Sequence, residues 1–104
     1  MFLVVFRNRK RASIDQAAYG AQADRMEELA RQQPGYLSFK SYTSDDGEVV
    51  ALSEWVDEAS ARAWGREAEH RAAQADGRAV WYANYTLFAC DSPRIHNFIA
   101  QDHA

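Results

Sequence analysis

The sequence predicts an α+β domain of the ferredoxin-like class, with the element order βαββαβ. Three observations predict this order: four segments rich in β-branched and aromatic residues, two longer segments with helical spacing, and turn residues between them. Such an order forms a four-stranded antiparallel sheet with both helices on one face, because crossover connections are right-handed. The length of 104 residues suits one domain of this kind.

The first strand is expected at residues 2–8, where Phe and Val recur without a helix breaker. Its apolar side chains fall on both faces of the strand, which indicates that both faces of the sheet are covered. A helix is expected next, because Ser13 and Gln16 have the spacing of a capping box and Asp15 suits the positive end of the helix dipole. This helix should end near residue 33, before a Pro-Gly pair.

The second and third strands are expected at residues 36–43 and 48–56. The Asp-Gly pair between them is a strong signal for a hairpin turn. In the second strand, simple alternation places Phe39 on one face and Tyr36 and Tyr42 on the other.

A second helix is expected from Asp57, which can cap it, to a second Asp-Gly pair. Gly65 lies inside this helix and weakens it by about 1 kcal/mol relative to Ala, so a kink is expected there. The last strand is expected at residues 78–89 and is dense in aromatic residues. The polar residues 91–104 should form a C-terminal extension, loose or lying on a neighbour, beyond a domain that spans residues 1–90.

Large apolar side chains occupy both faces of the predicted sheet, although the helices cover only one of them. The chain has three Trp, five Tyr and five Phe residues, and an exposed aromatic sheet face of that size tends to associate. The simplest cover is the same face of a second copy, which gives a closed two-fold arrangement. We therefore expect a homodimer formed through the sheet faces.

The composition of the chain argues against several kinds of partner and site. The net charge is −3, and the one basic cluster, at residues 7–11, can contact nucleic acid or an anionic ligand but is interpreted as a solvated strand end. No nucleic-acid partner is therefore expected. A single cysteine excludes an intrachain disulfide, and three histidines without acidic spacing make a metal site unexpected. No secretory signal or apolar run of about 20 residues is recognisable, so we expect no membrane partner and a cytoplasmic location.

A series of short motifs runs from the end of the first helix to the last strand. In order, they are Pro34-Gly35-Tyr36, Ala51-Leu52-Ser53-Glu54-Trp55, Trp64, Glu69-His70, Ala73-Gln74, Gly77-Arg78, Trp81-Tyr82 and Tyr85. Together they resemble the antibiotic biosynthesis monooxygenase domain family, and most closely its small single-domain bacterial members, over about residues 2–90. The resemblance implies a dimeric α+β barrel and a monooxygenase that uses molecular oxygen without flavin, haem or metal. Better-studied members act on aromatic polyketides such as anthrones, whereas other relatives degrade haem, act on small quinols or have no assigned activity.

Oxygen chemistry without a cofactor requires a substrate that supplies the electrons, a base, hydrogen-bond donors and aromatic walls. His70 is the candidate base because imidazole titrates near neutral pH, although a helix histidine bonded to a carbonyl or carboxylate is the structural alternative. Arg78 is suited to clamping an anionic substrate or to capping the preceding helix. Tyr85 is a candidate donor to a phenolate, or else an aromatic residue of the dimer seam.

Five further residues are candidates for binding the substrate. Asn8, at the end of the first strand, is placed to orient oxygen or substrate. Tyr42 has a phenolic donor, and Trp55, Trp64 and Trp81 each have an indole N–H that needs a partner if buried. Each of the three Trp residues is also a candidate for the core.

Two alternatives to a cofactor-independent oxygenase remain open. Haem-degrading relatives use an Asn on the first strand with a Trp and a His on the second helix, and Asn8, Trp64 and His70 have those types. A separation of six residues on the second helix, however, turns the imidazole about 120° from the indole. The second alternative is a non-catalytic dimer that binds a small apolar ligand. The sequence predicts a monooxygenase acting on a small aromatic, polyketide-like or quinol-like compound with molecular oxygen and no cofactor.

Overall fold

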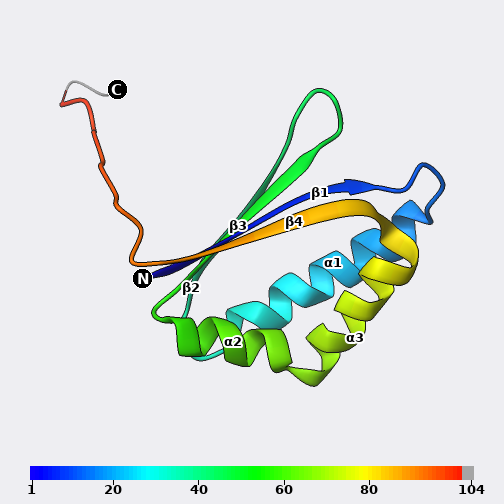
Figure 1. Ribbon diagram of the computed structural model, residues 1–104, viewed down its shortest axis with the longest axis horizontal. Coiled ribbons are helices and arrows are strands. Elements are labelled where there is room, and N and C mark those ends of the chain that lie inside the picture. Colours follow the sequence, from blue (N-terminus) through cyan, green and yellow to red (C-terminus); the bar gives the residue numbers. More distant parts are fainter. Residues whose placement is uncertain (102–104) are drawn as a thin grey trace.

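A computed structural model describes residues 1–101 and confirms the ferredoxin-like α+β architecture (Figure 1). The last three residues of the expected C-terminal extension lie outside the described residues. The sheet has the strand order β2-β3-β1-β4, with every neighbouring pair antiparallel, and the helices lie on one side of it. The elements are β1 (Phe2–Lys10), α1 (Gln16–Arg31), β2 (Tyr36–Thr43), β3 (Val49–Trp55), α2 (Glu58–Arg66), α3 (Ala68–Asp76), the π-helical turn η1 (Gly77–Trp81) and β4 (Tyr82–Asp91).

The central strand β1 forms the middle of the sheet, because it pairs with β3 on one side and β4 on the other. At one end Phe2 lies opposite Trp55, and at the other end Asn8 lies opposite Val49 and Tyr85. The even-numbered side chains of β1 face the helices and the odd-numbered ones face away. This strand therefore runs along the floor of the space beneath the helices.

Helix α1 begins later and ends earlier than expected. Asp15 caps it by accepting a hydrogen bond from the backbone N–H of Ala18 at 3.0 Å, so the capping box expected at Ser13 is wrong. Ser13 lies too far upstream, because the first helical residue directly follows Asp15. The helix ends at Arg31, and Gly35, with φ +85°, then turns the chain into β2.

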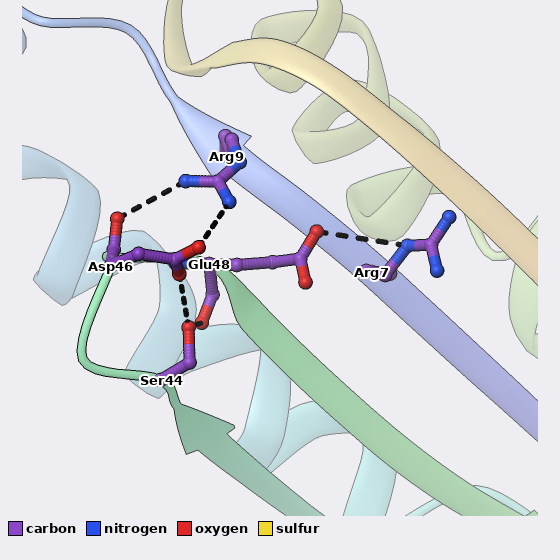
Figure 2. Close-up of polar contacts among 5 residues, drawn as sticks. All are labelled: Arg7, Arg9, Ser44, Asp46 and Glu48. Carbon is purple, nitrogen blue, oxygen red and sulfur yellow. Dashed lines mark hydrogen bonds and ion pairs between the residues drawn. The ribbon is translucent and has the colours of Figure 1, made fainter.

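The hairpin between β2 and β3 forms at the predicted Asp-Gly turn and is tied to β1 by ion pairs (Figure 2). Arg9 donates to the carboxylate of Asp46 at 2.8 Å, and Arg7 lies 3.7 Å from the carboxylate of Glu48. The Asp46 carboxylate also accepts hydrogen bonds from the Ser44 hydroxyl and, at 3.1 Å, from the Glu48 N–H. These hydrogen bonds, that of Ser44 most, hold the pKa of Asp46 well below its usual range.

A bulge at the start of β2 changes the face on which Tyr36 lies. Tyr36 pairs with Trp55, but the next paired residue, Ser38, lies opposite Glu54. The extra residue reverses the alternation, so Tyr36 shares the helix-facing side with Phe39. The opposite placement expected for Tyr36 is therefore wrong.

A second irregularity lies where β4 begins. Lys10 pairs with Tyr82, whereas Arg9 pairs with Asn84, so one residue of β4 has no partner. Strict alternation would separate Tyr82 and Tyr85, but the irregularity brings both to the helix-facing side, with ring centroids 6.0 Å apart.

The predicted second helix is two helices, and the expected kink at Gly65 is wrong. Helix α2 ends at Arg66, and Glu67 then adopts an extended conformation with φ −60° and ψ 135°. The Glu67 carboxylate accepts a hydrogen bond from the backbone N–H of His70 at 2.9 Å and so caps α3. One residue thus ends the first helix and starts the second.

The last strand begins at Tyr82 rather than at residue 78, because the π-helical turn η1 follows α3 directly. Arg11 holds this turn by donating to the carbonyl oxygens of Arg78 at 2.8 Å and Tyr82 at 3.0 Å. Gly77 lets the Tyr82 ring pack against the turn, since a Cβ atom there would lie 2.7 Å from the ring. Arg78 and Trp81 are therefore on η1 and not on β4.

Residues 92–101 leave the end of β4 and run away from the domain (Figure 1). The Ser92 N–H donates to the Met1 carbonyl at 2.9 Å. Farther along, Phe98 and Ile99 are 84% and 81% exposed. None of the described helices is long and apolar enough to cross a membrane.

Candidate active site

A cavity of about 850 Å³ lies between the sheet and the helices, with walls from all four strands, the three helices and η1. Tyr42 is not part of it. This residue lies on the other face of the sheet, opposite Val50, with the ammonium of Lys40 5.3 Å from its ring centroid. Seven of the eight predicted site residues line the cavity, namely Asn8, Trp55, Trp64, His70, Arg78, Trp81 and Tyr85.

His70, in the first turn of α3, has a defined tautomer. Its Nδ1 lies 2.9 Å from the carbonyl oxygen of Trp64, and because a carbonyl only accepts, Nδ1 carries the proton. The other ring nitrogen, Nε2, is then basic, and it has no hydrogen-bond partner among residues 1–101. Burial lowers the pKa of His70, against the opposing effects of the Trp64 carbonyl and the Glu67 charge. A neutral imidazole with a free Nε2 therefore lines the cavity.

The His70 ring stacks on the ring of Trp64, with centroids 3.9 Å apart and planes 9° apart. The expected divergence of these two side chains by about 120° is wrong, because the helix break at Glu67 reorients the chain between them. Trp64 also stacks on Trp55 at 6.3 Å. The rings of Trp55, Trp64 and His70 therefore form a row that begins on the sheet and ends with the imidazole.

The three indole N–H groups differ in whether the protein satisfies them. Trp55 donates to the Ser53 hydroxyl at 3.2 Å, and Trp81 donates to the side-chain oxygen of Gln22 at 2.8 Å. The indole N–H of Trp64 has no acceptor within the described part of the chain. Among the three, Trp64 is therefore the one with a donor available to a ligand.

Asn8 and Lys10 project from β1 into the cavity side by side. Asn8 is only 2% exposed, and its Oδ1 accepts a hydrogen bond from the Lys10 ammonium at 2.7 Å. The same ammonium lies 4.9 Å from the ring centroid of Tyr19 and 5.5 Å from that of Tyr82. Lys10 is not among the site residues that the sequence predicts, because it lies in a basic cluster expected to be solvated. Its spacing of two from Asn8 on a strand is the signal that places both on one face.

Tyr85 and Arg78 border the cavity near Tyr82. The Tyr85 ring is 5.1 Å from that of Phe6, and Tyr85 is 41% exposed. Arg78 has no ion-pair partner among residues 1–101, and its side chain caps no helix there; Arg11 binds the carbonyls of η1 instead. Burial raises the pKa of Tyr82, so its phenol stays protonated.

The cavity thus combines a base, donors without an acceptor in the described part of the protein, cationic side chains and aromatic walls. Within residues 1–101, no group of three or more His, Cys, Asp or Glu side chains is placed to hold a metal ion. The arrangement suits proton removal from a flat aromatic compound and stabilisation of the resulting anion.

Comparison with known proteins identifies similar sequences and folds. The family model for antibiotic biosynthesis monooxygenase matches residues 1–76. The protein YqjZ of Bacillus subtilis (strain 168) is 36% identical over 86 residues, which cover 83% of this chain and 74% of that protein. SnoaB, a cofactor-independent oxygenase from Streptomyces nogalater, has a TM-score of 0.75 and 16% identity, covering 90% of this chain and 94% of that chain. Rv0793 from Mycobacterium tuberculosis has a TM-score of 0.78 and 18% identity, covering 92% and 98%. At these identities, the two solved structures establish a shared fold.

Proposed function

Because this chain belongs to the antibiotic biosynthesis monooxygenase family, we propose that it oxidises a small aromatic compound with molecular oxygen and without a cofactor. The observation that carries the proposal is the free Nε2 of a neutral His70, held in a cavity with aromatic walls. Substrates of polyketide-like or quinol-like type fit, because they contain an acidic proton next to a flat ring system.

In the proposed reaction, His70 removes a proton from the substrate, and the resulting enolate or phenolate supplies the electrons that reduce oxygen. For a ring methylene, one oxygen atom becomes a carbonyl group and the other leaves as water, which balances the two hydrogens removed. The indole N–H of Trp64 is suited to donate a hydrogen bond to the substrate oxygen on which negative charge develops, and the amide of Asn8 is suited to bind another part of the substrate. We propose that Arg78 and Tyr85 act as catalytic residues together with His70.

Oxygen uptake tests this proposal. We expect the purified protein, in the presence of a chelator, to consume one oxygen molecule per molecule of at least one substrate from a panel of anthrones and hydroquinones. Heat-denatured protein is the control for autoxidation. Uptake at the rate of that control with every member of the panel would contradict the proposal.

Haem binding is the second candidate, and one observation favours it. Nε2 of His70 is free among the described residues, and the imidazole lies beside Trp64 rather than turned away from it. The residue types therefore fit a haem, whose iron would take this nitrogen as its ligand and supply the oxygen chemistry. A Soret band that appears with hemin and is lost in His70→Ala would favour this candidate over the first.

We also propose that the chain forms a homodimer through the sheet face that the helices leave bare. Apolar side chains from all four strands meet on that face: Val5 pairs with both Leu52 and Phe88, while Tyr42 lies on β2. Tyr42 and Phe88 are 51% and 47% exposed in the single chain. A two-fold contact buries this surface against itself.

Sedimentation equilibrium at micromolar concentration is expected to give twice the mass of one chain. Phe88→Glu should shift the protein toward a monomer, because it would bury two charges in the centre of the contact. Val80→Glu is the matched control, since Val80 is equally exposed at 48% but lies on η1, away from that face. A folded wild-type monomer under these conditions would rule out the dimer.

A further inference from the structure

We propose that the Lys10 end of the cavity is a subsite for an anionic group of the ligand, such as a carboxylate or phenolate. The subsite consists of Asn8, Lys10, Tyr19 and Tyr82. The inference rests on the proposed function only in assuming that the substrate occupies this cavity, and it names the substrate class as aromatic acids.

Lys10 has a charge that the described residues do not neutralise. Its ammonium has three N–H donors, and within residues 1–101 it forms one hydrogen bond, to the Oδ1 of Asn8 at 2.7 Å. No carboxylate among those residues lies within ion-pair distance of it. Arg62, another cation in the cavity wall, is instead paired with Glu58 at 2.7 Å. Lys10 therefore retains both charge and donors for a ligand.

Two tyrosine rings hold the ammonium in place without neutralising it. Lys10 lies 4.9 Å from the Tyr19 centroid and 5.5 Å from the Tyr82 centroid, within cation–π range. The two phenol oxygens lie 3.5 Å apart. Because burial raises the pKa of Tyr82, its phenol is not a competing anion. With no carboxylate of the described residues in ion-pair range either, this point offers a place for the negative charge of a ligand.

Asn8 adds a second donor beside the ammonium. Since its Oδ1 accepts from Lys10, its Nδ2 is the amide group left without a protein acceptor in the described residues. Asn8 is 2% exposed, so its side chain is almost fully enclosed by protein. An ammonium and an amide N–H on adjacent helix-facing positions of one strand match an oxygen anion rather than a cation.

The subsite lies at the opposite end of β1 from Trp55, the first ring of the row that contains His70. Asn8 and Phe2 are six residues apart on this strand, which corresponds to about 20 Å. Phe2 lies opposite Trp55, where the row of rings toward His70 begins. A single ring bound at Lys10 therefore does not extend along β1 to Trp55, and a fused-ring acid covers more of the floor of the cavity. This arrangement favours fused-ring aromatic acids over single-ring ones.

Isothermal titration calorimetry on the whole chain at pH 7.5 tests the subsite with anthracene-2-carboxylate and its uncharged primary amide. We expect the wild type to bind the carboxylate about 10-fold more tightly than the amide. Lys10→Met should abolish this preference by weakening only the carboxylate, and Lys10→Arg should retain it. Arg62→Met is the matched control and should retain the preference, because Arg62 is already paired.

Three outcomes would overturn the subsite: equal affinity of the wild type for both ligands, a preference that survives in Lys10→Met, or a preference lost in Arg78→Met alone. Circular dichroism checks the fold of each variant, and Lys10→Gln replaces Lys10→Met if the latter is unfolded. Calorimetry measures binding without turnover. The proposed subsite and the proposed oxygenase function can therefore be contradicted independently of each other. A protein that prefers the carboxylate through Lys10 but consumes no oxygen retains the subsite and loses the oxygenase function.

Discussion

Replacing His70 by alanine is expected to lower kcat about 10²–10⁴-fold for any substrate that supports oxygen uptake, the usual contribution of a positioned general base. The physical reason is the loss of Nε2, which carries the lone pair because the proton of the neutral ring is on Nδ1, bound to the Trp64 carbonyl. Steady-state oxygen uptake measures the change. Free imidazole should restore part of the rate in His70→Ala, because the deletion leaves a gap against the Trp64 ring.

The pH dependence of kcat/KM should report the same group. Only the neutral imidazole accepts a proton, so the rate rises with pH through the pKa of His70 and levels off above it. Burial lowers that pKa from its ordinary value of 6.5, which places the acid limb below pH 6.5. In His70→Ala the acid limb should disappear.

His96→Ala is the matched control for the histidine substitution. His96 lies exposed in the segment after β4 and is not among the residues that line the cavity, so its removal should leave kcat unchanged. Full activity in His70→Ala, or an acid limb that persists in it, would show that the imidazole has only a structural role.

Trp55→Ala is expected to lower the free energy of unfolding by about 3–5 kcal/mol, the usual cost of removing a buried aromatic side chain. Trp55 is 1% exposed and is the largest fully buried side chain among the described residues. The Tyr36 ring packs edge-on against it at 5.7 Å, and Trp64 stacks on it at 6.3 Å. The substitution removes both aromatic contacts and enlarges the cavity next to them.

Urea unfolding measures this loss of stability. Because association would add to stability, wild type and variant are compared at one protein concentration. Val80→Ala is the control, since Val80 is 48% exposed and its truncation should cost no more than about 0.5 kcal/mol. A loss below about 1 kcal/mol for Trp55→Ala would mean that the neighbouring rings collapse into the space, or that this row of rings does not stabilise the fold.

Much of the fold could be predicted, because it depends on patterns within short segments. The Asp-Gly turn forms the hairpin, and Asp57 caps α2 by accepting a hydrogen bond from the Ser60 N–H at 2.8 Å. Such signals act between residues a few positions apart, where the backbone alone brings the groups together. The order of strands and helices followed from these signals.

The candidate site was predictable in its residue types but not in its arrangement. Asn8, Trp64 and His70 are recognisable as donors and a base wherever they lie. Their relation depends on Glu67, whose extended conformation interrupts the helix and lets the imidazole stack on the indole. Helical periodicity cannot indicate a break that depends on one capping hydrogen bond.

The sequence by itself determined the α+β class, the element order and the amphipathic faces, since these depend on local propensity and periodicity. Only the tertiary structure decided that Tyr36 and Tyr82 face the helices, because a single extra residue in a strand reverses its alternation. It also decided that the half-buried Lys10 lies over two tyrosine rings. Whether a charged side chain is solvated depends on groups that distant segments bring next to it, and Tyr82 lies 72 positions away along the chain.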